Sequence, residues 1–512
     1  MKRIDLATSR GLFWLLAACG AGLVWLAPHP PMIDLPQHAG QLALLKQMLA
    51  GDAPWAHLLQ LDPFTPYYIG FGLALPLTFV MPVAAALKLM LSLAYLAFVG
   101  MCVLLRRHFR ADPRVDWLFL APFFGFAFQW GFFTFLVASS LGLCLVWLAD
   151  RHAQSPTLAR GTGVSLLATA LLFSHGLMFL FAMALSAALM LTRGPGLATR
   201  LRALAALVLP TVALLLYFAA RSQSEPAFGM PVTVPAVQWQ QGIRHEIFAY
   251  ALGLQWRPLY GLAGLAMLAA PWVMGLRPRL ATGSRAWVPF AGVAAVLLLV
   301  PSFVFETSFV YQRFALFLYP AYAWLFAAPE RSTPATPASM RSAALSGPVL
   351  VAAVASLLAS NGSRIWQFGR ESADFDAVSA QLLPRQRALA LIHDRASPAA
   401  DNASVYVHHA VWYQAEHGGL VDFNFATPPP QVLRYRVATR PPLGLGFAWR
   451  PSSFDWQLHR GQDYRYFFVR HDGQAPASLF AGAPCRPVLL AAQGRWQVYE
   501  RRDCAVGPKP GS

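Results

Sequence analysis

Long apolar runs separated by short charged segments occupy the first 360 positions of the chain. An apolar run of roughly 18 to 20 residues can cross the hydrocarbon core of a bilayer, which is about 30 Å thick. Eleven runs are candidate spans: 11–28, 84–105, 117–133, 134–149, 163–175, 176–192, 203–220, 259–276, 287–304, 309–328 and 343–360. The pattern predicts a polytopic α-helical membrane protein with about eleven transmembrane helices.

The charged segments between these runs indicate the orientation of the chain. The segments expected in the cytoplasm hold 17 Lys or Arg residues and five acidic residues, whereas the outer loops before residue 361 hold four cations and six acids. Because Lys and Arg collect on the cytoplasmic side, we expect the N-terminus inside and the C-terminus outside. No A-x-A cleavage site follows the first run at the usual place, so a retained signal-anchor is expected.

Residues 67–82 are also apolar, but a crossing there would put the cluster from Arg106 to Arg114 outside. We expect a re-entrant or interfacial helix broken by Pro76 and Pro82, with a second crossing as the alternative.

Beyond residue 360 the pattern changes. Short alternating runs, SVYVHHAVWY, DYRYFFVR and GRWQVYE, are typical of strands, and DFDAVSAQLLPRQRALALIHD has helical patterning. We therefore expect a multi-spanning domain over 1–360, with a long first outer loop at 29–66, and a water-soluble α/β domain over 361–512 on the periplasmic face. A disulfide between Cys485 and Cys504 suits that compartment, and two free thiols are the alternative.

Composition excludes a single cytosolic domain. The chain is 56% hydrophobic and 12% charged, about half the charged fraction of soluble proteins, roughly 25%. The net charge of +17 divides into cytoplasmic segments and an outer domain with 17 Lys or Arg against 12 acids, so it requires no nucleic acid. Phosphate-binding glycine loops, GxSxG and HExxH are absent, which leaves a soluble nucleotide enzyme unsupported.

The first outer loop contains the clearest candidate for chemistry. Asp34 follows the first span, and His38 comes four residues later. Apolar positions between Gln37 and Leu49 have a helical spacing that suits a helix lying on the membrane surface. A carboxylate there could act as the base that activates an acceptor against a lipid-linked donor, or Asp34 could simply cap the helix.

Two charged residues, Lys88 and Arg313, lie within predicted spans, both near the outer ends. Cations at that depth can hold a phosphate, with extension of the side chain toward the head groups as the alternative. Four further polar residues on the same predicted face are candidate substrate-binding groups: Glu306, His175, Arg244 and His245.

Four features together resemble the GT-C superfamily of membrane glycosyltransferases, particularly its arabinosyl- and mannosyltransferase-like members. Asp34 begins a long first outer loop whose helix ends in LLKQMLAGD. The segment DPFTPYYIGFGLALPL is similar to a motif often written P-P-L-Y-Y, and VAAALKLMLSL to A-A-R-L-x-S with Lys88 at the Arg position. A late span begins with YQRF and precedes a soluble outer domain.

The resemblance implies an inverting hexosyl or pentosyl transfer from a polyprenyl-phosphate sugar to an extracytoplasmic glycan, lipid or protein, in a bacterial inner membrane. Asp34 would be the base, and Lys88 and Arg313 the phosphate ligands. The paired acid of many members is absent, so His38 would take the second role or the activity has been lost. No cofactor is implied, and the loop has too few carboxylates for a metal-dependent member.

Two other interpretations stay open. An O-antigen ligase or polymerase-like enzyme also uses outer-loop arginines, but those families place their largest outer loop in the middle of the chain, whereas this chain has its extramembrane mass at the C-terminus. A transporter or a non-catalytic scaffold is the alternative outside the enzymes, although no internal repeat of the kind found in transporters is present.

Overall fold

The computed structural model describes residues 8–62, 65–193, 196–224, 244, 246–279, 285–304, 307–328, 337–427, 431–444, 446–473, 475–476, 478–484 and 487–502. The chain forms two compact units. The helical unit comprises Met1–Leu23 and Leu91–Gly362, and the α/β unit comprises Val24–Met90 and Ser363–Ser512. The first outer loop, which the sequence pattern grouped with the membrane spans, therefore belongs to the same compact unit as the C-terminal segment.

The helical unit consists of α-helices and short 3-10 turns. Its helices, two of which (α4 and α16) also enter the α/β unit, are α1 (Arg10–Gly22), α4 (Val83–His108), α5 (Phe126–Trp130), α6 (Phe133–Gln154), α7 (Leu158–Leu172), α8 (Gly176–Leu191), α9 (Leu197–Leu204), α10 (Val208–Ser224), α11 (Ile247–Tyr250), α12 (Pro258–Val273), α13 (Trp287–Leu299), α14 (Val310–Phe314), α15 (Leu318–Ala323) and α16 (Pro337–Glu371). Two small ladders join β2 (Arg277–Pro278) to β5 (Phe326–Ala327) and β3 (Phe303–Val304) to β4 (Thr307–Ser308).

Length and composition identify the helices of the described residues that could cross a membrane. Four segments are long and apolar enough: Val83–His108, Phe133–Gln154, Leu197–Ala220 and Ser346–Ser379. Six shorter apolar helices accompany them: Arg10–Trp25, Tyr68–Phe79, Leu158–Leu172, Gly176–Leu191, Pro258–Val273 and Trp287–Leu299. The chain is therefore a helical protein with several apolar helices, as its hydrophobic pattern predicts.

Several predicted spans are not continuous α-helices, and two of them show the causes. Region 117–133 contains the 3-10 turns Pro113–Phe119 and Pro122–Phe124 and then α5, which ends at Gly131 with a left-handed φ of 93°. Pro122 lacks the N–H that a continuing helix needs, and Gly131 tolerates the left-handed conformation, so both interrupt the run. Region 309–328 is divided between α14 and α15 by a 3-10 turn.

The apolar segment 67–82 is broken as expected. Helix α3 (Tyr68–Ala74) is followed by a 3-10 turn over Pro76–Phe79, and α4 begins at Val83, directly after Pro82. The ammonium group of Lys46 donates a hydrogen bond to the Thr78 carbonyl (2.6 Å), which ties this turn to the helix of the first loop.

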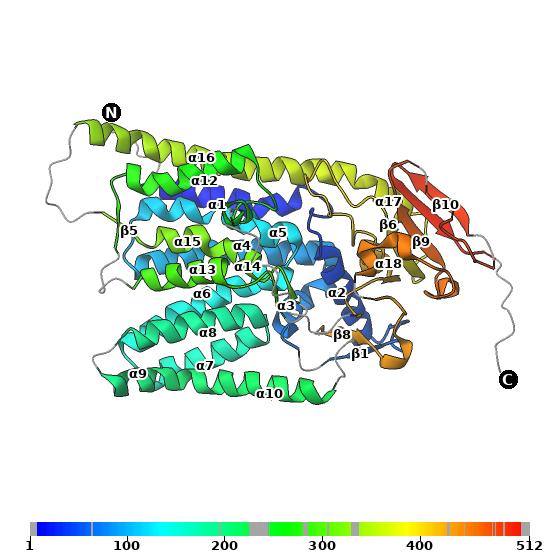
Figure 1. Ribbon diagram of the computed structural model, residues 1–512, viewed down its shortest axis with the longest axis horizontal. Helices are drawn as coiled ribbons and strands as arrows, with labels where there is room; N and C mark the ends of the chain where they lie inside the picture. Colours follow the sequence, from blue (N-terminus) through cyan, green and yellow to red (C-terminus); the bar gives the residue numbers. More distant parts are fainter. Residues whose placement is uncertain are drawn as a thin grey trace. The chain divides into compact units, whose positions relative to one another are not determined.

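The α/β unit is built on a five-stranded sheet. Its strands, in spatial order, are β10 (Val488–Gln493), β11 (Trp496–Glu500), β9 (Tyr466–Arg470), β6 (Arg387–Ile392) and β7 (Leu420–Asp422). Strands β9, β6 and β7 are parallel to one another, whereas β11 runs antiparallel to both of its neighbours, β10 and β9. Helix α17 (Ala373–Ser379) lies against β10 and β11, and α18 (Val411–His417) lies against β7 (Figure 1). Apolar side chains of β6 and β9 pack with Trp456 in a buried core.

The strand predictions for this unit hold in two of three runs. DYRYFFVR contains β9, and GRWQVYE contains β11, its antiparallel partner. SVYVHHAVWY, by contrast, forms turns and then α18, so the strand prediction there is wrong. Positions 405–412 of that run are all buried, and a run buried on every side has no periodicity that separates strand from helix. The helical pattern of 374–394 holds only for α17, since its second half is β6.

The first loop contributes a helix and a strand to this unit. Helix α2 (Leu35–Leu49) packs against α18, and every residue of α2 from Leu35 to Leu45 is buried. The expectation of a helix lying on the membrane surface is therefore wrong, because its polar positions face protein. Strand β1 (Leu59–Leu61) pairs antiparallel with β8 (Leu433–Tyr435) (Figure 1).

Candidate functional site

Asp34 lies at the start of α2, where it occupies the N-cap position. Its side chain makes no capping hydrogen bond, and Pro36 occupies the first turn. Instead, Asp34 Oδ1 lies 3.7 Å from His408 Nε2, and the Asp34 side chain retains 14% exposure. The carboxylate therefore sits at the helix end without acting as its cap.

Gln37 fixes the orientation and the protonated nitrogen of His408. The Gln37 Oε1 atom accepts a hydrogen bond from the Phe425 backbone N–H (2.9 Å), and Nε2 donates to the Phe423 carbonyl (3.1 Å). The same Nε2 lies 2.9 Å from His408 Nδ1, so this ring nitrogen must accept. The ring proton of His408 is then on Nε2, the atom that faces Asp34.

His408 is also neutral at physiological pH. Complete burial lowers its pKa from 6.5 to about 3, because the charged imidazolium would lose its hydration. Asp34 is thus faced by a fixed, uncharged N–H donor. At 3.7 Å this donor lies just beyond hydrogen-bond distance of the carboxylate.

His38 lies one turn after Asp34 on α2. Its ring packs near Phe71 (5.7 Å between centroids) and edge-on to Phe425 (5.4 Å). Burial lowers the pKa of His38 to about 3, so this imidazole is neutral as well. The structure places His38 among aromatic rings and brings His408, which sequence reasoning did not assign to this site, near Asp34.

A cavity of about 370 Å³ lies beside Lys88, and we call it the Lys88 cavity; it is lined by Pro28, His29, Pro82, Ala84, Ala85, Lys88, Asp376, Ser379, Glu416 and His417. Lys88 donates to the Ala27 carbonyl (3.2 Å) and lies over the Trp25 ring at 5.1 Å. His29 lies 2.7 Å from Glu416 and 3.4 Å from Asp376. Two carboxylates thus flank His29 in a cavity that the Lys88 ammonium also lines.

Sequence reasoning missed His29, Asp376 and Glu416 as a group. They come from the first loop, from α17 and from α18, and only the fold brings them together. The sequence offered one signal, the unusual pairing of Glu416 with His417 after two consecutive histidines.

The other predicted site residues belong to the helical unit, where each contacts local structure. Arg313 donates to the Ser308 and Phe309 carbonyls and lies over the Phe132 ring at 3.9 Å. His175 accepts from the Met178 backbone N–H as the N-cap of α8. Arg244 donates to the carbonyls of Leu297 and Val300.

Four residues of the sequence predictions lie outside the described residues: His245, Glu306, Cys485 and Cys504. Among the residues that the structure describes, no group of three His, Cys, Asp or Glu side chains could hold a metal ion.

The described residues therefore form a unit of apolar helices and an α/β unit, and an acidic residue, Asp34, stands at the start of the first loop helix. No protein-family model and no curated protein sequence matches it. Among solved structures, the cryo-EM structure of the arabinofuranosyltransferase AftD from Mycobacteria matches with a TM-score of 0.49 and 15% identity. A point mutant of that enzyme matches with a TM-score of 0.50 and 14% identity.

These matches cover 96% of this chain but only 40% and 41% of the arabinofuranosyltransferase chains, so this protein spans about two fifths of their length. The crystal structure of ArnT from Cupriavidus metallidurans in the apo state matches over 96% of this chain and 97% of that chain, with 16% identity and a TM-score of 0.42. The fold is thus similar to that of the arabinofuranosyltransferase mutant, and at the level of the fold this confirms the resemblance stated from the sequence.

Proposed function

We propose that the protein is an inner-membrane glycosyltransferase that moves a sugar from a polyprenyl-phosphate donor to an extracytoplasmic glycan, lipid or protein. The α/β unit would face the periplasm. The observation that carries the proposal is the Asp34 carboxylate, held 3.7 Å from the neutral N–H of His408 in a fold similar to that of GT-C glycosyltransferases.

In the proposed reaction, Asp34 accepts the proton of the acceptor hydroxyl or amine as that atom attacks the anomeric carbon. The bond between the anomeric carbon and the phosphate oxygen breaks, and the lipid phosphate departs with the bonding electrons. Attack from the face opposite the leaving group inverts the anomeric configuration. His408 is a positioning residue in this scheme: its N–H orients the Asp34 carboxylate once the 3.7 Å separation shortens to a hydrogen bond in the substrate complex.

Lys88 and Arg313 are the cations that we propose for the lipid phosphate. An ammonium group has three donors, and Lys88 uses one of them on Ala27, so two can reach a phosphate. Arg313 is the second cation of this proposal. Roles in substrate binding for His175, Arg244, His245 and Glu306 are part of the same proposal, and no metal is required by it.

Replacing the base tests the proposal directly. We expect Asp34→Asn to lower transfer about 10²- to 10⁴-fold, the usual contribution of a general base. The measurement is profiling of glycans and prenyl-linked sugars in cells carrying the variant, beside wild type and a deletion. Asp52→Asn is the matched control, because this loop carboxylate is exposed and paired with Arg385 on the surface.

If the variant folds and accumulates the same prenyl-linked donor as the deletion, the transferase assignment stands. If it fully rescues the deletion, Asp34 is not the base, and a transporter or scaffold becomes the better interpretation.

The role of His408 has its own test. We expect His408→Gln, which retains an N–H donor, to preserve more activity than His408→Leu, which removes it. A purely structural role for the ring would give the two variants equal losses at equal folded fractions, measured by tryptophan fluorescence of the purified protein.

A further inference from the structure

A second and larger cavity opens at the edge of the sheet where β6 and β9 begin and β11 ends. It has a volume of about 750 Å³, within the roughly 300 to 1,000 Å³ typical of ligand sites. We call it the arginine cavity, because four arginines line it: Arg387, Arg465, Arg501 and Arg502. All of its lining residues belong to the α/β unit.

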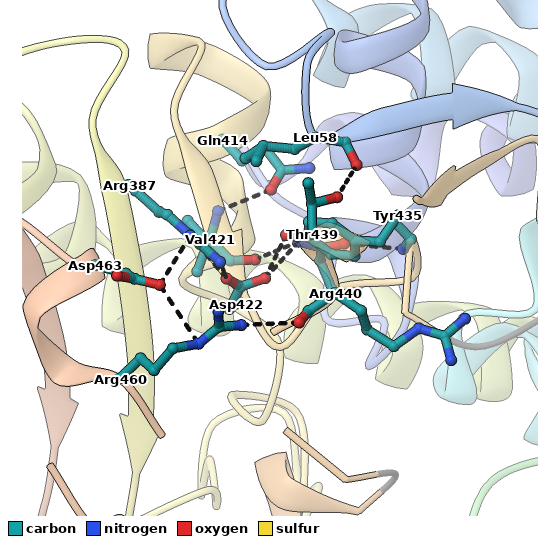
Figure 2. Close-up of polar contacts among 12 residues, drawn as sticks. Leu58, Arg387, Gln414, Val421, Asp422, Tyr435, Thr439, Arg440, Arg460 and Asp463 are labelled. Carbon is teal, nitrogen blue, oxygen red and sulfur yellow. Dashed lines mark hydrogen bonds and ion pairs between the residues drawn. The ribbon is translucent and has the colours of Figure 1, made fainter. Parts of the chain in front are cut away.

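Two of these arginines are fixed by carboxylates. Arg387 pairs with the fully buried Asp422 (2.9 Å) and reaches Asp463 (3.6 Å), as Figure 2 shows. Arg465 pairs with Glu500 (2.9 Å). These pairs form a rigid wall, because each guanidinium is held by a partner across the sheet edge.

The other two arginines have donors to spare. Within the described part of the chain, the side chain of Arg501 makes one hydrogen bond, from Nε to the Tyr464 carbonyl (3.0 Å), which leaves both Nη groups for a ligand. Arg502 bonds Glu500 through Nε, with half of its side chain exposed. Four guanidinium groups face two lining carboxylates, Asp463 and Glu500, and Asp422 lies behind Arg387, so the cavity and its buried partner have a formal charge of +1.

An aromatic side chain completes the site. The indole N–H of Trp55 donates to the Gly418 carbonyl (3.0 Å), which fixes the ring at the cavity wall, and the exposed His57 lies two residues further on. A fixed ring offers an apolar surface to the C–H face of a sugar, while guanidinium groups bind carboxylate or phosphate in paired hydrogen bonds.

We propose that the arginine cavity binds a segment of anionic glycan, a chain of sugars that carries carboxylate or phosphate groups. The role of this glycan as the acceptor or product of sugar transfer rests on the proposed function, whereas the binding of the glycan to the cavity does not. The anionic class follows from the excess of guanidinium groups, and the carbohydrate class from the fixed indole and the size of the cavity.

Binding to the purified full-length protein tests the proposal. The probes are a galacturonic acid trisaccharide, a mannose trisaccharide carrying one phosphate, an unmodified mannose trisaccharide and inorganic phosphate, each measured by isothermal titration calorimetry. We expect one of the two anionic trisaccharides to bind at least tenfold more tightly than the neutral one, and the preferred probe identifies the anion. If the neutral trisaccharide binds as tightly as the anionic ones, the anionic assignment is overturned. If inorganic phosphate binds as tightly as they do, the glycan assignment is overturned.

Variants locate the binding. We expect the double variant Arg501→Gln, Arg502→Gln to weaken binding at least tenfold, and Arg450→Gln, an exposed arginine outside the cavity, to leave it unchanged. Unchanged binding by the double variant would overturn the site. Asp34→Asn should bind as wild type does, so a failure of the proposed reaction and a failure of this site give different results.

Discussion

The Lys88 cavity and the arginine cavity belong to the same unit but carry opposite charge. The first places one ammonium beside two carboxylates around His29, and the second places four guanidinium groups beside two carboxylates. A phosphate that approaches Lys88 also approaches Asp376 and Glu416, whereas an anion in the arginine cavity meets Arg501 with both Nη groups available. Cations alone therefore do not define an anion site, because the carboxylates beside them decide its net charge.

Among substitutions at neutral pH, the largest effect is expected where the wall of the arginine cavity is buried. We expect Arg387→Met to lower the free energy of unfolding by about 3–5 kcal/mol, because it leaves the fully buried Asp422 without its cation. Chemical denaturation of the full chain in detergent measures the change. Arg450→Met is the matched control, since Arg450 is an exposed arginine of the same unit; a change there beyond about 0.5 kcal/mol would contradict the contrast.

Acid should destabilise the region around Asp34 through its neutral histidines. Folding lowers the pKa of His38 and of His408 from 6.5 to about 3, so between these values the unfolded chain binds more protons than the folded one. The contribution of the two histidines to the free energy of unfolding is therefore fully present above about pH 6.5. It falls as the pH drops toward 3, by about 1.4 kcal/mol per pH unit for each histidine.

Unfolding of His38→Phe at several pH values checks this expectation. In this variant, the slope of the unfolding free energy against pH should be smaller by the contribution of one histidine. His57→Phe, at the exposed histidine of the arginine cavity, should retain the slope of the wild type. Equal slopes in all three proteins would show that buried neutral imidazoles do not set the acid sensitivity.

The smallest effect is expected at the Lys88 cavity. Glu416→Gln removes one negative charge but keeps an oxygen that can accept from His29. If the cavity receives the lipid phosphate, donor affinity should rise severalfold, since a partly exposed charge contributes about 1 kcal/mol or less. Titration with a short-chain prenyl-phosphate measures it beside Asp472→Asn, an exposed carboxylate elsewhere in the unit. Weaker binding would show instead that Glu416 contacts the donor.

Local pattern predicted those parts of the molecule whose signal is local. Hydrophobic runs identified the apolar helices, alternation identified β9 and β11, and two prolines identified the break after α3. The position of Asp34 at the start of a loop helix was also readable from the sequence. Its partner His408 was not readable. Gln37, which orients His408, is 371 residues away from it in the sequence, and nothing in either segment specifies the pairing.

The errors have the same physical origin. Helix α2 reads as amphipathic because Gln37, His38 and Gln41 interrupt its apolar positions, and polar residues at such a spacing normally face water. Here the Gln41 amide exchanges two hydrogen bonds with the backbone of Leu433, which satisfies it inside the protein. A sequence shows that a group is polar, but only the fold shows what satisfies it.

The ladder between β1 and β8 joins the beginning of the chain to a late segment, with Leu61 paired to Leu433. Ribosomes elongate at about 5–20 residues per second, so roughly 20 to 75 s separate the synthesis of the two strands. Throughout that interval the first loop lacks the partner that completes its ladder, while the Leu91–Gly362 part of the helical unit is being synthesised. The biogenesis of this protein therefore requires that the loop stay unaggregated until the last third of the chain arrives.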